Sequence, residues 1–224
     1  MLTVHASSSM GNCYSWDGLL VEAGLPFRDI MRRVAPKVCI ITHEHKDHCK
    51  AAKELARFGV PIMASLGTLE AMGMNGVVMY PGKWQVIGNG FKVLPFEAVH
   101  DAREPLGFVI AKGGERVLFA TDTAELNYRF DGLTEIFVEC NYCDRLLAED
   151  DGLAIEARVR IARSHMSLER LLAFFCINDM RGVKRITLLH LSDGHSDAGY
   201  FKKTIEAATG RPVSIATKNT GRTI

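Results

Sequence analysis

Short apolar runs separated by turn-forming residues dominate the chain, and longer helical patterns lie between them. Runs rich in β-branched and aromatic residues are typical of strands. The predicted strands are Leu2–Ala6, Leu19–Glu22, Lys37–Ile41, Pro61–Ala64, Phe91–Val99, Gly107–Ala111, Arg116–Ala120, Ile136–Glu139 and Arg185–Leu189. Apolar positions that recur every three or four residues predict helices. The predicted helices are Phe27–Val34, His48–Phe58, Leu168–Met180 and Ala198–Ala208.

Two polar residues mark the starts of predicted helices. Ser167 precedes the third helix and Asp197 the fourth. Both side chains can accept a hydrogen bond from an N–H group of the first helical turn. Many strands with interspersed helices favour sheets packed between helical layers, which is an α/β architecture. No repeat or linker interrupts the chain, so we expect one domain over residues 1–224.

One turn carries four potential metal ligands. The sequence Thr42-His43-Glu44-His45-Lys46-Asp47-His48 follows an apolar strand pattern and precedes a helical one. A turn can direct neighbouring side chains at two different points, which a helix face cannot. Imidazole and carboxylate ligands suit zinc, and less strongly manganese or iron. We therefore expect two imidazoles to close on one ion while Asp47 and His48 reach a second.

Three more polar residues stand at the tips of apolar strand patterns. His100, Asp122 and His190 end the runs at 91–99, 116–120 and 185–189. Each residue alone is more often an ordinary strand-end residue. If these strand ends converge on one edge, however, they and the turn at 42–48 supply seven ligands. That number suits two ions that share one carboxylate.

Composition and charge narrow the class of protein. The 224 residues are 47% hydrophobic and carry a formal net charge of +1, which fits a globular chain and argues against a long basic track for duplex DNA. No run approaches the ~18 apolar residues of a membrane span, and the N-terminus lacks signal-peptide character. We therefore expect a cytoplasmic protein with free thiols. The pair Cys140 and Cys143 lacks the second pair of a zinc ribbon.

The order His-x-His-x-Asp-His, followed by His, Asp and His at strand ends, resembles the metallo-β-lactamase superfamily. The resemblance extends from Leu2 to about Ser214. It implies an αββα four-layer sandwich with two divalent metal ions on one edge, zinc being favoured over manganese. In the implied ligand set, the first ion is held by His43, His45 and His100, and the second by Asp47, His48 and His190, with Asp122 bridging them.

Some segments resemble particular branches of the superfamily, and others depart from its pattern. The start, Ser7–Tyr14, and the segment Glu139–Asp144 resemble the YycJ-type (WalJ-type) exonucleases, although those relatives have His where this chain has Tyr142. The segment Ser164-His165-Met166-Ser167 resembles more distantly the end of RNase Z. The superfamily's Asp-x-Gly after its second strand is Glu22-Ala23-Gly24 here, which leaves the ligands intact but changes the hydrogen bonds around them.

Two residues receive catalytic roles from the resemblance. His165 would face the scissile phosphate and protonate the leaving alkoxide, because an imidazole titrates near neutral pH. The alternative for His165 is an ordinary helix-start residue. Asp47 would bind the second ion and orient the hydroxide that two ions generate from a bridging water.

Other polar residues have weaker assignments. Ser167 and Arg163 are expected to contact the substrate beside His165. Arg163 forms a cluster with Arg158 and Arg160, which is either a phosphate-binding group or the solvated face of a helix. His195 has no matched position in the family.

The resulting hypothesis is a binuclear metal-dependent phosphodiester hydrolase, a DNA exonuclease that acts on DNA ends. The near-neutral charge keeps open a phosphodiesterase for cyclic nucleotides or another small phosphodiester nucleotide, and an RNA-processing nuclease is a second alternative. A thioester or lactam hydrolase leaves His165 without a role, and a non-catalytic binding module has no need of an open metal site. No membrane partner is expected, and a homodimer stays open.

Overall fold

The computed structural model describes residues 1–216 and divides the chain into two compact units. The first unit comprises Met1–Glu97 and Ala102–Phe108 together with Ala216, and the second comprises Ala98–Asp101 and Val109–Ile215. The single hydrolase domain expected over residues 1–224 stays a prediction. No helix in the described part of the chain has the length and apolar character that crossing a membrane requires.

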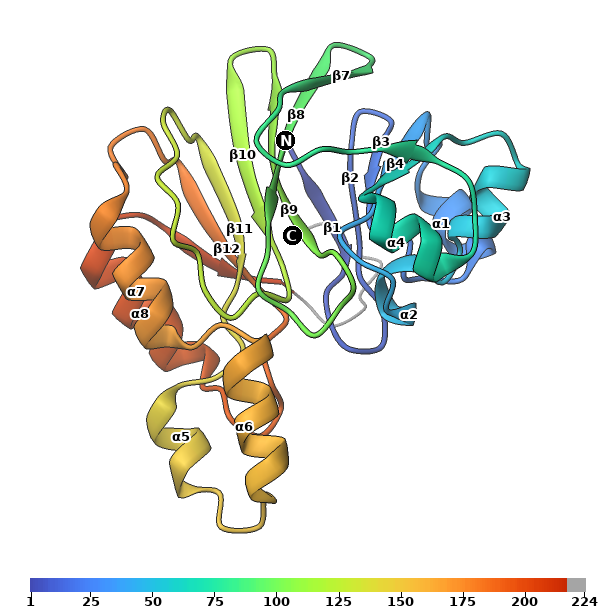
Figure 1. Cartoon of the computed structure of the whole chain (residues 1–224). Coiled ribbons are helices and arrows are strands. Elements are labelled where there is room, and N and C mark those ends of the chain that lie inside the picture. The colour runs from blue at the N-terminus through green and yellow to red at the C-terminus, as the bar shows by residue number, and fades with distance from the viewer. Residues whose placement is uncertain (217–224) are drawn as a thin grey trace. The chain divides into compact units, whose positions relative to one another are not determined.

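The first unit is built on a six-stranded sheet with the order β1-β2-β3-β4-β5-β6 (Figure 1). Its strands are β1 (Thr3–Ala6), β2 (Cys13–Trp16), β3 (Leu19–Val21), β4 (Val38–Ile40), β5 (Ile62–Ala64) and β6 (Val77–Val78). Strands β1 to β3 pair antiparallel, and the pairs from β3 to β6 are parallel. Its helices are α1 (Phe27–Arg33), α2 (Lys46–Cys49), α3 (Ala52–Arg57) and α4 (Leu66–Met72).

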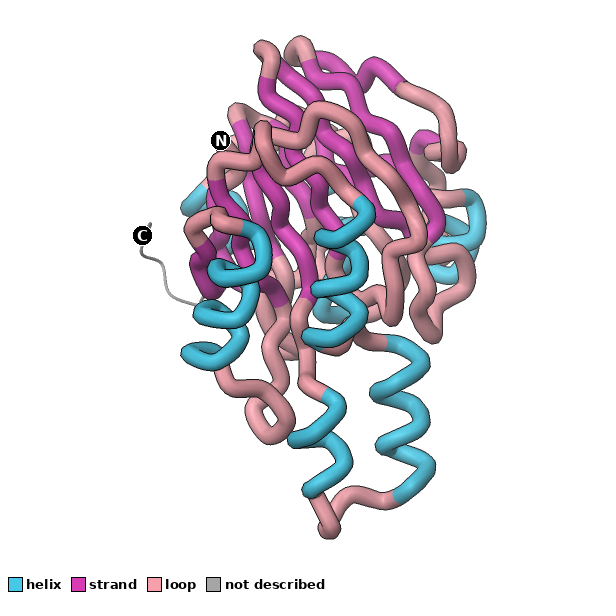
Figure 2. The backbone as a smooth tube through the Cα atoms, turned by 90° about the vertical axis from the view of Figure 1, so that its left-hand side faces the viewer, coloured by secondary structure: helices cyan, strands magenta, loops and turns pink. Residues whose placement is uncertain are grey.

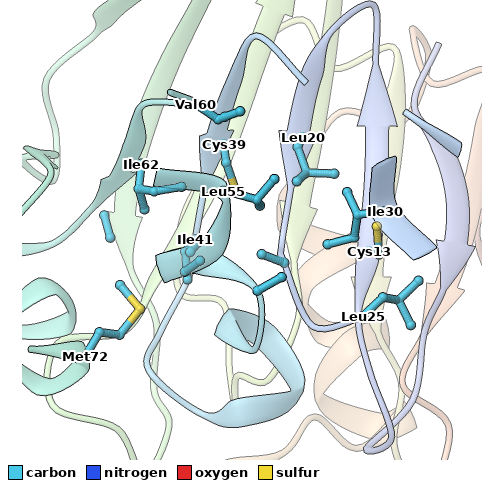
Figure 3. Packing of buried hydrophobic residues seen from close by; sticks show 14 of the residues in the cluster. Cys13, Leu20, Leu25, Ile30, Cys39, Ile41, Leu55, Val60, Ile62 and Met72 are labelled. Carbon is cyan, nitrogen blue, oxygen red and sulfur yellow. The ribbon is translucent and has the colours of Figure 1, made fainter. Parts of the chain in front are cut away.

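Apolar side chains hold the helices of the first unit against its sheet, as Figure 3 shows. Ile30 of α1 lies beside Leu20 and Cys13, and Leu55 of α3 lies beside Cys39. All five side chains are fully buried. Burying an Ile or Leu side chain stabilises a fold by roughly 1.5–3 kcal/mol. This core therefore holds β3 and β4 in place. Strand β4 leads into the ligand-bearing turn, and β3 leads into the segment that begins at Glu22.

The second sheet has the strand order β13-β12-β11-β10-β9-β8-β7. Its strands are β7 (Gln85–Gly88), β8 (Phe91–Glu97), β9 (Leu106–Lys112), β10 (Glu115–Ala120), β11 (Glu135–Glu139), β12 (Arg185–Leu189) and β13 (Val213–Ile215). Strand β9 runs from the first unit into the second. Strands β10 to β13 pair parallel. Every residue of β11 is buried, as expected for a parallel strand covered on both faces.

Four helices belong to the second unit. They are α5 (Asp144–Glu149), α6 (Ile155–Ser164), α7 (Leu168–Ile177) and α8 (Ala198–Thr209). Figures 1 and 2 show α7 and α8 along the sheet of this unit, and α5 and α6 as a pair beyond the strand ends. The predicted caps are confirmed, because Ser167 accepts from Arg170 N and Asp197 accepts from Tyr200 N.

The predicted alternation of strands and helices is confirmed, with corrections at particular elements. The helix predicted over 48–58 is two helices, because Ala51 N donates to Ala23 O at 2.9 Å instead of continuing the helix. The third predicted helix ends at Ile177, where Asn178 turns extended and its side chain donates to Tyr128 O. The elements absent from the prediction are β2, β6, β7, β13, α4, α5 and α6.

Close backbone contacts hold the ligand-bearing turn against the residue before β2 and the segment that follows β3. Asn12 N donates to Asp47 O at 2.7 Å, and Ala23 N donates to His48 O at 2.7 Å. A Cβ atom at Gly24 would overlap the Asp47 carbonyl oxygen and lie 2.6 Å from Asn12 N. Position 24 therefore requires glycine, because there is no room for a side chain.

We expect Gly24→Ala to lower the free energy of unfolding by about 1–3 kcal/mol, because the added methyl group forces the Asp47 backbone to move. Urea unfolding followed by circular dichroism measures the change. Gly194→Ala is the matched control, since a Cβ there meets nothing within 4 Å, and it should change stability by less than about 0.5 kcal/mol. If the two variants are equally stable, the backbone at Asp47 can move away from the added methyl group at little cost, and the prediction is wrong.

Candidate metal centre

The turn of the first unit brings two imidazoles together, with the rings edge to face and their centroids 4.7 Å apart. β4 ends at Ile40, α2 begins at Lys46, and His43 and His45 lie between them. His43 Nδ1 lies 2.9 Å from Thr42 Oγ1, and His43 Nε2 lies 3.1 Å from His45 Nδ1. Two nitrogens bound to one tetrahedral zinc are ~3.3 Å apart for Zn–N bonds of ~2.0–2.1 Å. The spacing of this pair is therefore close to that of two ligands of one ion.

His48 is held from behind by a buried carboxylate. His48 Nδ1 lies 3.4 Å from Glu22 Oε2, and both side chains are fully buried. Glu22 Oε1 also accepts from Thr42 N at 3.2 Å. Burial raises the pKa of the Glu22 carboxyl, and the neighbouring His48 opposes this. A carboxylate behind an imidazole fixes the ring and its tautomer, as in many metal sites. Glu22, which stands where the superfamily has Asp, therefore supports the His48 ring despite its longer side chain.

Asp47 and His48 meet around one amide. Asn12 Nδ2 donates to Asp47 Oδ2 at 3.2 Å and lies 3.1 Å from His48 Nε2. Asp47 Oδ2 itself lies 3.1 Å from His48 Nε2. The Asp47 carboxylate and the His48 Nε2 atom therefore point to the same place. Asn12 was not predicted from the sequence, although it lies within the segment Ser7–Tyr14.

In the second unit, three parallel strands end in polar residues that lie together. Asp122 follows β10, Glu139 ends β11 and His190 follows β12. Asp122 and His190 have positive φ angles of 42° and 52°. Left-handed backbone is rare for residues other than glycine, and it concentrates at functional sites. These turns direct the side chains towards the neighbouring strand ends instead of along the strands.

Glu139 contacts both imidazoles of this cluster, and it was not predicted as a site residue from the sequence. Its Oε1 atom lies 2.6 Å from His165 Nδ1 and 3.1 Å from His190 Nδ1. Its Oε2 atom accepts from Thr123 N and Met166 N, both at 3.0 Å. Its position at the end of an apolar strand pattern could have identified it, because the predicted ligands His100, Asp122 and His190 have the same position.

The charges in the cluster shift the pKa values of its members. Burial alone would raise the pKa of the Glu139 carboxyl, but the His165 and His190 imidazoles lower it below its usual value. Burial alone would lower the pKa of His190, but Asp122 and Glu139 raise it to about 10. The same carboxylates raise the pKa of His165. Two buried carboxylates thus favour positive charge at this place, which imidazolium or a metal ion can supply.

The ligand atoms of this cluster suit a divalent ion. One atom from each of Asp122, Glu139, His165 and His190 lies within 4.8 Å of the others. Where His190 donates Nδ1–H to a carboxylate, its Nε2 carries the lone pair that a metal takes. The chemistry of the donor set therefore fits zinc or a similar ion.

His100 is oriented by the end of helix α6. Its Nδ1 atom donates to Ser164 O at 2.7 Å, and its Nε2 atom lies 3.2 Å from Asp101 Oδ1. The His100 and His165 rings lie edge to face, with centroids 5.3 Å apart. Donation from Nδ1 makes Nε2 the nitrogen with the lone pair, as a ligand requires.

The structure gives other predicted residues structural roles. Ser167 is fully buried and caps α7, which argues against direct contact with substrate. Arg158 donates to Ala148 O and Asp150 O, and Arg160 Nε lies 2.8 Å from Asp101 Oδ2. Only Arg163 of the predicted arginine cluster stays exposed with no such partner in the described part of the chain.

His195 and the two nearby cysteines are also structural. His195 Nε2 lies 2.8 Å from Asp150 Oδ2, which ties the loop after β12 to the α5–α6 connection. Cys140 and Cys143 are buried, unbridged thiols. Burial raises the pKa of Cys140 well above its usual value, which keeps the thiol protonated and poorly reactive.

The fold and the candidate ligands, imidazoles and carboxylates at the carboxyl ends of strands in an α/β protein, are those of a metal-dependent hydrolase. Residues 19–191 match the β-lactamase superfamily domain. The chain belongs to this family, and the predictions of superfamily, fold class and metal-dependent hydrolase are confirmed.

Individual relatives agree with this assignment. The chain is 26% identical over 195 residues to the exodeoxyribonuclease WalJ of Streptococcus pneumoniae, covering 75% of this chain and 72% of WalJ. Zn²⁺-bound PqqB from Methylobacterium extorquens has a TM-score of 0.71 at 14% identity, with 98% of both chains covered. A diphosphatase of the PhnP family has a TM-score of 0.67 at 15% identity, covering 98% of this chain and 94% of its own.

We expect Glu139→Gln to weaken the pH dependence of stability in the chelator-treated protein. The folded-state pKa values of His165 and His190 lie above the unfolded value of 6.5. Their stabilisation is therefore fully present below about pH 6.5 and is lost as the pH rises through their folded values, about 10 for His190. Removing the Glu139 charge lowers both imidazole pKa values and flattens this fall.

Urea unfolding between pH 6.5 and 10, with histidine titration by NMR, measures the effect. Glu115→Gln is the control, because Glu115 pairs with Lys184 on the surface at 2.7 Å. Identical slopes and identical histidine pKa values in wild type and Glu139→Gln would contradict the role of Glu139.

Proposed function

We propose that the chain is a binuclear metal-dependent phosphodiester hydrolase that acts as an exonuclease on DNA ends. The observation that carries the proposal is the Glu139–His165 pair, with 2.6 Å between Oε1 and Nδ1, beside the ligand candidates Asp122 and His190. An imidazole held by a buried carboxylate is suited to give a proton to a leaving alkoxide. Hydrolysis of a thioester has less use for such an acid, because a thiolate leaves without a proton.

The proposed ligand set follows from the family and from the orientation of each side chain within its own unit. The proposed ligands of the first ion are His43, His45 and His100; those of the second are Asp47, His48 and His190; and Asp122 is shared. Zinc is the first choice because imidazole and carboxylate ligands suit it and a relative of the same fold binds it. Manganese is the alternative.

The chain's own residues divide the catalytic work. Divalent ions at the site would lower the pKa of a bound water and withdraw charge from a phosphodiester oxygen. His165 keeps Nδ1 on Glu139, so Nε2 donates the proton to the leaving oxygen. Asn12 fixes one oxygen of Asp47 by the 3.2 Å hydrogen bond, and Asp47 orients the nucleophile. No covalent intermediate with the protein is needed.

The DNA-end substrate is supported by the similarity to WalJ, whose name is that of an exodeoxyribonuclease. A solved structure with the same fold is named a diphosphatase of the PhnP family. The net charge of +1 also favours a short contact with nucleic acid. A cyclic nucleotide or another small phosphodiester is therefore the second candidate. All six cysteines are unbridged, which suits the proposed cytoplasmic location.

A hydrolysis screen tests the proposal. Zinc- and manganese-loaded protein is assayed with end-labelled single- and double-stranded DNA, RNA, cyclic nucleotides, a lactam and a thioester. We expect DNA shortened from one end. Turnover of cyclic nucleotides without DNA cleavage would move the assignment to the small substrate, and turnover of only the lactam or thioester would overturn the phosphodiesterase.

We expect His165→Ala to slow DNA cleavage by about 10²–10⁴-fold, the usual range for a lost general acid. A nitrophenyl phosphodiester should lose much less, because nitrophenolate leaves without a proton. His195→Ala is the control, since His195 pairs with Asp150 outside the ligand cluster. If both substrates slow equally and metal content falls, His165 is a ligand instead.

We expect the purified protein to bind close to two divalent ions per chain, and Asp122→Ala to lose at least one of them together with activity. Metal that binds only the folded state raises its stability by mass action. Zinc should therefore raise the melting temperature of the wild type more than that of the variant. Elemental analysis gives the stoichiometry, and a fully loaded, active Asp122→Ala protein would contradict the shared-ligand assignment.

A further inference from the structure

A cleft of about 610 Å³ lies along helix α6 in the second unit. Its lining comes from His100, Asp101 and one side of α6, where Ile155 and Val159 and the carbon atoms of polar side chains make most of the surface apolar. This volume lies in the range of small-molecule pockets. His100 is a proposed metal ligand, so the cleft begins beside the proposed reaction site and leads away from it.

The far part of the cleft presents an apolar shelf. Ile155 and Val159 are 75% and 42% exposed, and their spacing of four residues places them on one face of the helix. In the described chain, α6 buries only Ser164, so these apolar side chains do not serve the core. Two neighbouring exposed aliphatic side chains can pack against the face of a nucleobase, and such a contact does not depend on which base it is.

The part of the cleft nearest His100 contains one positive side chain, Arg163, that is not paired with any carboxylate that the structure describes. Arg163 lies one helical turn beyond Val159, is exposed, and has no partner among residues 1–216. By contrast, Arg160 is occupied by Asp101 at 2.8 Å. Because Ser164 O accepts from His100 Nδ1 at 2.7 Å, the Arg163 end is the end nearest the proposed metal site. A phosphate next to the scissile one would meet this guanidinium.

The length of the cleft limits the occupant to a short single strand. From Ile155 to Ser164 the helix rises about 13 Å at 1.5 Å per residue, enough for about two nucleotides. Glu156 lies at the far end, where its charge repels a continuing phosphate backbone and its oxygens can accept from a base amino group. One available arginine cannot supply the many phosphate contacts by which proteins grip a duplex.

We infer that the α6 cleft binds the terminal one or two nucleotides of a single-stranded DNA end. The base lies on Ile155 and Val159, and its phosphate pairs with Arg163. This inference rests on the proposed phosphodiesterase function and adds the substrate class: the DNA end must be unpaired before it reaches the metal site. Selection is by strand form and not by base sequence.

The test uses Arg163→Gln and the double variant Ile155→Ala/Val159→Ala, which keeps the helix because alanine favours it. Anisotropy of a labelled single-stranded hexamer measures binding to the metal-loaded protein. We expect each variant to bind about five- to tenfold more weakly, and Arg163→Gln to reduce the slope of log K against log salt by about 0.7. On cleavage, the loss for the hexamer should exceed that for a nitrophenyl phosphodiester by about fivefold.

Controls separate the cleft from folding and from the proposed function. Ile177→Ala/Arg181→Gln changes an exposed apolar residue and an exposed arginine of the same unit and should bind as the wild type does. Thermal melts check folding. If the wild type hydrolyses no phosphodiester, the proposed function fails; if it does so but the cleft variants bind the hexamer equally well, only this inference fails.

Three other results would overturn the inference. One is no hexamer binding by the wild type. The second is equally tight binding of a blunt duplex with the same sensitivity to the variants. The third is a dimer of the wild type that becomes a monomer in the double variant, because the shelf would then be covered by a second copy of the chain.

Discussion

The Glu139 carboxylate is the group on which the arrangement of the second unit's site depends. A buried carboxylate is costly unless its oxygens are satisfied. Here one oxygen serves the Nδ1 atoms of His165 and His190, and the other serves the backbone N–H groups of Thr123 and Met166. The four contacts come from the segments after β10 and β12 and from the α6–α7 junction. One side chain thus sets the relative positions of three segments that carry proposed ligands or the proposed acid.

Left-handed backbone at strand ends adds a second constraint. Glu22, Asp122 and His190 have φ angles of 66°, 42° and 52°, which cost an L-residue roughly 1–2 kcal/mol each. Polar contacts hold them: Glu22 binds Thr42 N, and Asn141 Nδ2 donates to His190 O at 2.8 Å. The strain brings each side chain out of the strand direction, and a metal bound there would add to the forces that maintain it.

The sequence predicted what local pattern determines and missed what distant contacts determine. Polar residues at the ends of apolar runs identified Asp122 and His190. Glu139 has the same context, but its importance comes from imidazoles 26 and 51 residues away along the chain. Helix α6 was not among the predicted helices, and its apolar residues Ile155 and Val159 are exposed, so they mark one helix face without joining the core. The structural role of Arg158 likewise exists only in the folded chain, where it donates to Ala148 O and Asp150 O.

The hydrogen bond from His100 Nδ1 to Ser164 O joins a proposed ligand to the last turn of α6. Anything that fixes the His100 ring therefore also limits the motion of the helix end, and anything that holds the helix end favours one orientation of the ring. By thermodynamic reciprocity, if an occupant along α6 changes the affinity of His100 for an ion, the ion changes the affinity for the occupant by the same factor. If the α6 cleft and His100 have their proposed roles, metal affinity would vary with occupancy of the cleft, although neither contact requires the chain to change its fold.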